Sequence, residues 1–331
     1  HYSGAELAGL VRSAASFALA RSMDAEADGV VTVQDLEKAL QEVHPFLGPQ
    51  EDLLKSRYPF GISAYSSSME RILRDLERFS APLSAHTVPR LQSLLVVGAG
   101  TGGAGATALS AWAASKASEK GHADFVRLVT ALDLLSNAGG EEARAAALVE
   151  RFEEAREMSH SLLVLDDVDQ LCAGVGGYSS VMVATLRALL RSPPPTDSKR
   201  GVKTMSILAA TSRSDSACVV LHELFDETLG KECCALHDDS LTPFTFTVVP
   251  QLEEADSVRQ LLQDCLPNSF PDLDAASSAI IDRLGRVGCK TVLRLAERAM
   301  NSDDDRQRAL ETILDDLVGD TVTANSLCEV L

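Results

Sequence analysis

The sequence predicts an α/β fold with a five-stranded parallel sheet, followed by a bundle of helices. Two observations lead to this prediction. Five short apolar runs alternate with helical segments between residues 86 and 250, and uninterrupted apolar runs are typical of strands buried on both faces of a parallel sheet. Beyond Gln251 no strand pattern remains, and the periodicity is helical.

The chain begins with two segments of helical periodicity. In SGAELAGLVRSAASFALAR, from Ser3 to Arg21, apolar residues recur at steps of three and four, and VTVQDLEKALQEV predicts a second helix that starts near Thr32. Two helices bury too little apolar surface to form a domain. We therefore interpret residues 1–45 as the helical end of a preceding domain and expect the chain to be a piece of a longer protein.

Three further regions follow. Residues 46–85 begin with the proline- and glycine-containing HPFLGPQED and continue into an amphipathic helix, SSSMERILRDLERF, so they predict a linker and a leading helix. Residues 86–250 contain the expected strands, within SLLVVG, DFVRLVT, SLLVLDD, TMSILAATS and FTFTVVP. Residues 251–331 predict four helices.

Composition excludes several classes of function. The 331 residues carry a formal charge of −18 and one tryptophan, which disfavours a nucleic-acid-binding surface. The seven cysteines form no CxxC pair, so reduced thiols are expected rather than a zinc site or a disulfide framework. The uncharged stretch Leu94–Ser115 changes from strand-like to glycine-rich to helix-like, which argues against a membrane span.

A glycine-rich segment after the first strand fits two kinds of nucleotide site. GAGTGG matches the dinucleotide pattern GxGxxG at Gly98, Gly100 and Gly103. GTGGAGAT, residues 100–107, matches the phosphate loop GxxxxGK[ST], but Ala106 stands where the lysine should be. Either pattern would set a phosphate against backbone N–H groups at the start of a helix.

The residues downstream favour the phosphate loop. A dinucleotide site needs an acid at the end of the second strand, where Asp124 and Asp133 both fit poorly. A phosphate-loop NTPase needs an apolar strand that ends in an acid for Mg²⁺, and SLLVLDD ends in Asp166 and Asp167. The next strand ends near Ser212, a polar residue in a position to contact a γ-phosphate or water.

Several motifs, in order and spacing, resemble the N-ethylmaleimide-sensitive fusion ATPase family, whose members are AAA+ proteins. SGAELAGLVRSAASFALAR is similar to the end of that family's first AAA domain. ATALSAWAA, SLLVLDDVDQL, ALLRSPPP, LAATSRSD and GCKTVLRLAERA are similar to its second AAA domain. The resemblance implies an AAA+ phosphate-loop NTPase fold with a C-terminal helical lid, preceded by helices left from another AAA domain.

The resemblance also implies a site for ATP and Mg²⁺. Asp166 and the Thr107 hydroxyl would hold the metal, while Asp167 stands in the position of the catalytic glutamate and Ser212 would be a second catalytic residue. Lys290 would reach the phosphates from the lid. The implied nucleotide-binding residues are Gly100, Gly102, Gly103, Ala104, Gly105, Ala106, Thr107, Ala108 and Lys290.

Two departures from the family's pattern predict weak or absent hydrolysis. Ala106 removes a charged contact to the phosphates, of a kind that contributes roughly 1.5–3 kcal/mol. No arginine lies between Arg213 and Arg259, where an arginine finger for a neighbouring subunit is expected.

The resemblance implies a second AAA domain that holds a homo-hexamer together for ATP-driven disassembly of SNARE complexes, which other domains and adaptor proteins engage. The parent protein would be an ATPase in vesicle transport, cytoplasmic and peripheral to vesicle and Golgi membranes. Alternatives are an active ATPase in which Lys290 or another cation compensates for Ala106, an assembly domain that binds no nucleotide, and a dinucleotide-binding (Rossmann) oxidoreductase that uses GAGTGG.

An acidic segment, DAEADGVVTVQD, resembles a calcium-binding EF-hand loop. Asp24, Glu26, Asp28 and Gly29 stand at the first, third, fifth and sixth positions. The twelfth position is Asp35 instead of the bidentate glutamate, and there is a single copy. We interpret the segment as an acidic loop between two helices.

Overall fold

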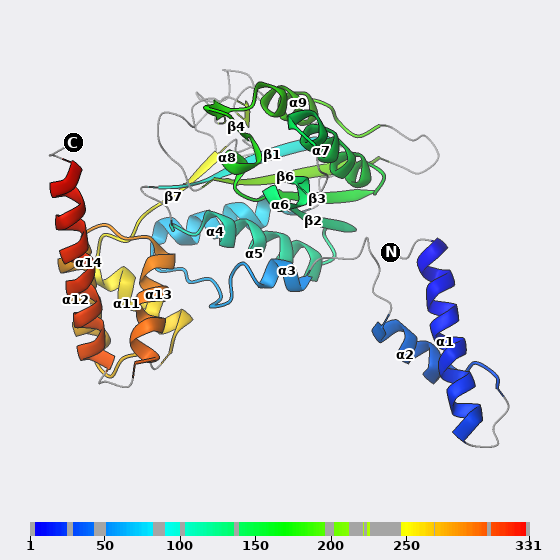
Figure 1. Cartoon of the computed structure of the whole chain (residues 1–331), viewed down its shortest axis with the longest axis horizontal. Coiled ribbons are helices and arrows are strands. Elements are labelled where there is room, and N and C mark those ends of the chain that lie inside the picture. Colours follow the sequence, from blue (N-terminus) through cyan, green and yellow to red (C-terminus); the bar gives the residue numbers. More distant parts are fainter. Residues whose placement is uncertain are drawn as a thin grey trace. The chain divides into compact units, whose positions relative to one another are not determined.

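A computed structural model of the chain describes two separate units, His1–Gln50 and Glu51–Leu331 (Figure 1). The residues described are 4–24, 29–42, 51–81, 90–99, 103–135, 139–195, 202–211, 221, 224–225, 246–267, 269–302 and 306–328.

The first unit is a pair of helices in contact, α1 (Gly4–Asp24) and α2 (Val33–Glu42). Ala14 and Ala18 of α1 and Ala39 of α2 are buried, so small side chains let the two helices approach each other. The two helices predicted at the start of the chain are confirmed.

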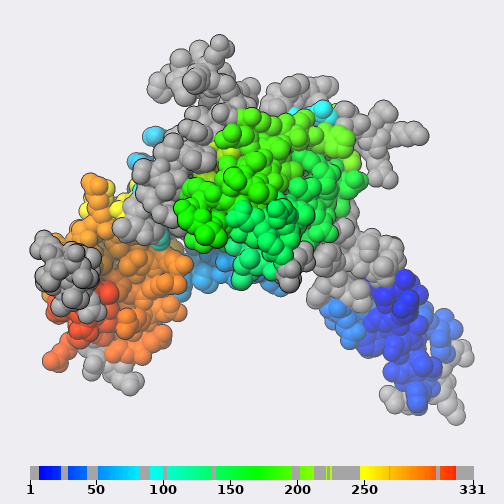
Figure 2. Space-filling model, turned by 45° about the horizontal axis from the view of Figure 1, so that its top comes forward, coloured from blue at the N-terminus to red at the C-terminus, as the bar shows by residue number. Residues whose placement is uncertain are grey.

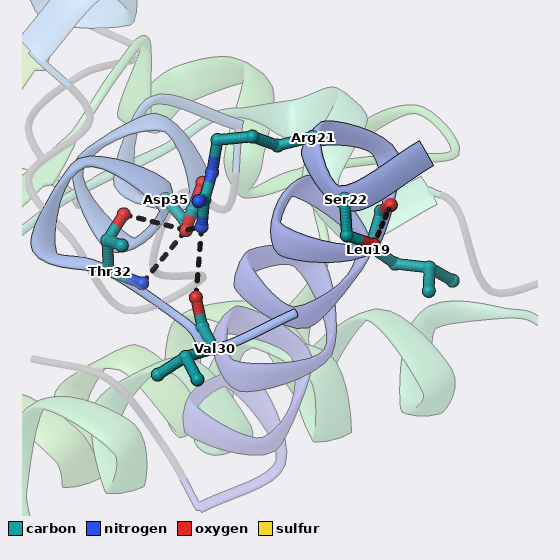
Figure 3. A network of polar contacts seen from close by, with 6 residues as sticks. All are labelled: Leu19, Arg21, Ser22, Val30, Thr32 and Asp35. Carbon is teal, nitrogen blue, oxygen red and sulfur yellow. Dashed lines mark hydrogen bonds and ion pairs between the residues drawn. The ribbon is translucent and has the colours of Figure 1, made fainter. Parts of the chain in front are cut away.

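Polar contacts join the two helices at one end (Figure 3). The Asp35 carboxylate, only 2% exposed, accepts hydrogen bonds from the Thr32 backbone N–H at 2.8 Å and from the Thr32 hydroxyl at 2.7 Å. It also pairs with the Arg21 guanidinium at 2.7 Å, which in turn donates to the Val30 carbonyl oxygen. Asp35 is the third residue of α2, so its bond to Thr32 is the carboxylate half of a capping box.

These contacts favour the structural interpretation of the acidic segment. Asp35 stands at the twelfth position of the EF-hand-like pattern, and Arg21 and Thr32 already occupy its carboxylate. Glu26 and Asp28 lie outside the described residues.

The second unit is built on a parallel sheet of five strands in the order β2-β3-β6-β1-β7. The strands are β1 (Leu91–Gly98), β2 (Phe125–Val129), β3 (His160–Leu165), β6 (Thr204–Thr211) and β7 (Phe246–Val249). All five strands predicted from apolar runs are confirmed, with boundaries shifted by a few residues.

Helices cover both faces of this sheet (Figure 1). On one face lie α3 (Glu51–Lys55), α4 (Ser67–Phe79) and α5 (Ala106–Glu119), and on the other α7 (Glu141–Arg156) and α9 (Ser180–Leu190). The central strands are accordingly buried over almost their whole length, as expected for a parallel sheet between two helical layers.

Four helices predicted after residue 251 form a bundle at the C-terminal end of the unit, coloured yellow to red in Figure 1 and mainly orange in Figure 2. They are α11 (Ala255–Cys265), α12 (Leu273–Leu284), α13 (Cys289–Met300) and α14 (Arg306–Cys328). Their buried side chains belong to one hydrophobic cluster with α4, α5 and the sheet. Leu252 and Val287 exchange two backbone hydrogen bonds, which ties the start of the bundle to the α12–α13 connection.

Three short features were not predicted from the sequence. Helices α3 and α6 (Ala131–Leu135) have five residues each, too few to show a helical period. A small hairpin, β4 (Ala173–Gly174) with β5 (Gly177–Tyr178), follows the four-residue helix α8 (Val168–Leu171). Helices α3 and α4, which the sequence analysis assigns to a linker and a leading helix, belong to the second unit and contact α5. The domain boundaries drawn from the sequence stay a prediction.

None of the described helices is long and apolar enough to span a bilayer.

Candidate functional site

A pocket of about 760 Å³ opens where β1 and β3 end and α5 begins. Four segments contribute to its wall: the loop between α3 and α4, the glycine-rich loop, the two aspartates after β3, and helices α11 and α13 of the C-terminal bundle. Ligand sites in open parallel sheets lie beyond the carboxyl ends of the strands, and pockets of this size are typical of small-molecule sites.

The glycine-rich loop leads into α5 through two glycines in left-handed conformations. Gly103 has φ 77° and Gly105 has φ 102°, values that favour glycine because a Cβ atom would be strained there. Gly105 is the N-cap of α5 and supplies no side-chain hydrogen bond, so the first backbone N–H groups of the helix have no side-chain cap. Such a helix end is suited to an anion.

Asp166 and Thr107 meet at this helix end. The Thr107 hydroxyl donates a hydrogen bond of 2.8 Å to Asp166 Oδ1. Asp166 is 5% exposed, and its backbone N–H donates to the Val129 carbonyl oxygen, which fixes the residue after β3. Both side chains are predicted from the sequence to hold Mg²⁺, and the structure brings them together.

Arg57 approaches the same carboxylate from the loop after α3. Its Nη1 lies 3.4 Å from Asp166 Oδ2, and its side chain is 34% exposed. Sequence analysis did not identify Arg57, because SRYPFGIS carries the features of a connecting loop and no nucleotide motif. The contact depends on the tertiary packing of α3 against α5.

Asp167 has an unusual backbone conformation and a perturbed carboxyl group. With φ 48° it is the one residue other than glycine in the left-handed region among those described, and it is the N-cap of α8. Burial raises the pKa of Asp167, and the charges of Asp166 and Asp169 act in the same direction, while Lys290 and Arg57 oppose them. Its carboxyl group therefore lies where negative charges are crowded and water is reduced.

The end of β6 adds one more polar contact. The Thr211 hydroxyl donates a hydrogen bond of 3.0 Å to Asp169 Oδ1, and both side chains are buried. Ser212, the predicted catalytic residue that follows Thr211, lies outside the described residues, as do Gly100 and Gly102.

Helix α13 is fastened to the glycine-rich loop by a backbone bond. The Lys290 N–H donates to the Gly103 carbonyl oxygen at 2.9 Å, and a Cβ atom on Gly103 would lie 3.4 Å from the Thr291 hydroxyl oxygen. The Lys290 side chain is exposed at the pocket, as expected for a residue that reaches a ligand from the lid.

Another part of the pocket wall is largely apolar. Ile62, Tyr65 and Met69 line it from the α3–α4 region, and Leu261 and Cys289 line it from the bundle. Burial raises the pKa of the Tyr65 hydroxyl, which donates to the Pro250 carbonyl oxygen at 3.3 Å. An apolar wall beside a polar loop suits a ligand with a flat base and a charged tail.

Most predicted site residues share this pocket. Of the residues assigned from the sequence, the pocket wall contains Gly103, Ala104, Gly105, Ala106, Thr107, Ala108, Asp166, Asp167 and Lys290. The donor set of a carboxylate and a hydroxyl matches the oxygen ligands that Mg²⁺ prefers, and the uncapped helix end matches a phosphate. The residues present therefore fit a nucleotide bound with Mg²⁺. The one departure is Ala106, which stands where the phosphate loop usually has a positively charged lysine.

The order of strands does not support the dinucleotide alternative. In a Rossmann fold the second strand pairs with the first, and its terminal acid holds the ribose. Here β1 pairs with β6 and β7, and β2 is the edge strand on the far side of β3. An acid at the end of β2 is therefore separated from the glycine-rich loop by two strands.

Comparison with known families agrees with the strand order. Residues 96–232 match the family described as ATPase family associated with various cellular activities (AAA). The fold of the second unit is thus of the AAA class, with the five-stranded parallel sheet and the C-terminal helices predicted from the sequence.

Within that class its relatives are vesicle-fusing proteins. The vesicle-fusing ATPase of Dictyostelium discoideum is 30% identical over 227 residues, 65% of this chain and 29% of that protein. The vesicular-fusion protein SEC18 of Saccharomyces cerevisiae is 27% identical over 324 residues, and the vesicle-fusing ATPase of Arabidopsis thaliana is 28% identical over 316 residues. Each of the latter two alignments covers 92% of this chain and 38% of the relative, so the chain spans well under half the length of these proteins.

Proposed function

We propose that this chain is the second AAA domain of a vesicle-fusing ATPase, with the helical end of the first AAA domain at its start. On this proposal it binds ATP with Mg²⁺, hydrolyses it slowly or not at all, and helps to hold a hexamer together. The observation that carries the proposal is the pocket in which Thr107 and Asp166 meet at the uncapped end of α5.

Binding without efficient hydrolysis follows from the charges around the pocket. The loop has Ala106 in place of a lysine, so one positive charge near the phosphates is missing. Asp167 has a shorter side chain than the usual glutamate base, and its carboxyl group is crowded by Asp166 and Asp169. No arginine lies between Arg213 and Arg259, so the region expected to supply an arginine finger to a neighbouring subunit has none.

The wider role is proposed from the relatives. Alignments that cover 92% of the chain must include part of its first unit as well as the AAA part, as expected if both come from one vesicle-fusing ATPase. In that role the hexamer would disassemble SNARE complexes, engaged through adaptor proteins and other domains. Such a protein would act in the cytoplasm at vesicle and Golgi membranes.

The test is a titration of the purified chain with ATP, once in the presence of Mg²⁺ and once in the presence of a chelator. ATP turnover and the molar mass in solution are measured on the same protein. We expect saturable ATP binding that Mg²⁺ strengthens, turnover far below that of an active AAA ATPase, and assembly promoted by ATP. A chain that stays monomeric at high concentration with ATP would contradict the assembly role.

Turnover and binding also separate the alternatives. Turnover that is lost in both Asp166→Ala and Asp167→Ala would show an active ATPase instead of an assembly domain. Assembly with no detectable nucleotide binding would show that the domain associates by packing alone.

A further inference from the structure

Arg57 is a cation at the phosphate end of the pocket that no nucleotide motif accounts for. It follows α3, and its backbone N–H donates to the Leu54 carbonyl oxygen, so the last turn of that helix fixes its Cα position. Its side chain lines the pocket and reaches Asp166, which the Thr107 hydroxyl contacts at the end of α5. Arg57 thus lies beside the elements that suit a phosphate.

The hydrogen-bonding capacity of this guanidinium is largely unused. A guanidinium has five N–H donors. Within the described residues, the ion pair to Asp166 at 3.4 Å is longer than a usual charge-assisted hydrogen bond, and the buried Nε–H has no partner. A buried donor without an acceptor is costly, so an anion within reach of Arg57 would be stabilised by donors that the protein leaves free.

The glycine-rich loop lacks the charge that Arg57 has. Ala106 is the first residue of α5 and is 5% exposed, so no side chain from that position reaches a ligand. A polyphosphate seated on the loop would meet backbone N–H groups and the helix end without a lysine. Three cations lie in the pocket wall: Arg57, Lys290 and Arg294. Among the described residues, Arg57 alone forms an ion pair with the carboxylate beside Thr107.

We propose that Arg57 binds the polyphosphate of the nucleotide and replaces the missing loop lysine. Without nucleotide it pairs with Asp166; when a nucleotide arrives, its N–H groups turn to phosphate oxygens and the carboxylate becomes available to Mg²⁺. This inference rests on the proposed function, because it requires a nucleotide in this pocket.

The experiment measures the affinity of the full chain for ATP, ADP and adenosine by calorimetry, with Mg²⁺ and with a chelator. Variants Arg57→Ala and Arg57→Lys are compared with Arg71→Ala, an exposed arginine on α4 outside the pocket wall. We expect Arg57→Ala to weaken ATP and ADP binding about tenfold or more, the effect of losing a charge-assisted contact, and to leave adenosine binding unchanged. Arg57→Lys retains part of the affinity, and Arg71→Ala retains all of it.

A second variant tests the replacement directly. Ala106→Lys restores the loop charge, and we expect it to recover most of the ATP affinity in the Arg57→Ala background while adding little to the unmodified chain. Equal gains from Ala106→Lys in both backgrounds would show two independent contacts and overturn the replacement.

Three results for Arg57→Ala would also overturn the inference. These are unchanged ATP affinity, an equal loss for ATP and adenosine, and a loss that follows a lowered melting temperature of the nucleotide-free protein. In each case the unmodified chain still binds ATP, and the proposed function stands. An unmodified chain that binds neither ATP nor ADP would overturn the proposed function and this inference together.

Discussion

The two units of this chain bury aspartates beside arginines in two different ways. In the helix pair, one oxygen of Asp35 has three partners: the Thr32 N–H and hydroxyl both donate to Oδ2, and Arg21 pairs with it at 2.7 Å. In the AAA part, Asp166 receives one hydrogen bond from Thr107 and a looser ion pair from Arg57, and two more aspartates lie close to it.

The same residue type therefore has opposite electrostatic surroundings. The Arg21 and Thr32 contacts hold the pKa of Asp35 well below its usual range. Burial and neighbouring carboxylates raise the pKa of Asp167. An aspartate that accepts several hydrogen bonds stabilises the local fold. Neighbouring aspartates with few donors repel one another, and a bound cation relieves that repulsion.

The largest expected effect separates the two sites by their response to Mg²⁺. Asp166→Asn removes the charge beside Thr107, and we expect the strengthening of ATP binding by Mg²⁺ to fall about 10- to 100-fold, as for supporting groups at metal sites. Asp35→Asn is the matched control and leaves ATP affinity unchanged. Calorimetry with Mg²⁺ and with a chelator measures both, and equal effects of the two substitutions would break the comparison.

Amide hydrogen exchange tests the helix pair, where the substitution of Asp35 and not that of Asp166 is expected to have an effect. Asp35→Asn loses the ion pair to Arg21 and weakens the cap of α2, so amide hydrogen exchange is expected to speed up through residues 29–42. Asp166→Asn should leave that region protected as before. Exchange measured by mass spectrometry decides this, and unchanged protection in Asp35→Asn would show that packing of the alanines is sufficient.

A smaller effect, in the stabilising direction, is expected at Asp167. Its folded-state pKa lies above the unfolded value of about 3.9, so the ionised form costs stability above the folded pKa and the cost disappears below the unfolded one. Asp167→Asn should therefore raise the melting temperature of the nucleotide-free protein at pH 7. The gain should shrink as the pH falls through the folded-state pKa and be absent below about 4; a gain that is constant with pH would implicate packing.

The smallest effect is expected at Asp35, where acid lowers stability, the opposite of its effect at Asp167. The folded-state pKa of Asp35 is depressed, so it contributes stability above the unfolded value of about 3.9 that is lost as the pH falls through the folded one. Helicity of the first unit should decrease over that acid range in the unmodified chain and change less in Asp35→Asn. Circular dichroism of a peptide spanning residues 1–50 would follow this, provided that the isolated peptide is helical at pH 7.

Much of the fold could be predicted because its elements are long and simply patterned. The strands are mostly apolar and alternate with helical segments, of which α4 and α13 are clearly amphipathic, so the alternation specified a parallel sheet. The glycine-rich loop and the acids after β3 could be paired because strand ends meet at one edge. The predicted roles of these residues remain to be measured.

The rest of the site depended on contacts distant in sequence. Arg57 and Asp166 are brought together by packing of α3 on α5, and a five-residue helix gives no periodic pattern from which that packing can be inferred. The left-handed conformation of Asp167 could not be predicted from the sequence either, because aspartate is common at strand ends in ordinary backbone conformations. The order of strands, which argues against the dinucleotide alternative, is set by pairing rather than by composition.

The bond between the Lys290 N–H and the Gly103 carbonyl oxygen has a consequence for mutagenesis. Main-chain atoms make it, so exchanging the lysine for alanine or glutamate leaves the lid attached to the loop and reports on charge alone. Proline at that position lacks the N–H and is tolerated in the first turn of a helix. Comparing the alanine or glutamate variant with the proline variant can separate the effect of the Lys290 side chain on ligand binding from the effect of its main chain on the position of the lid.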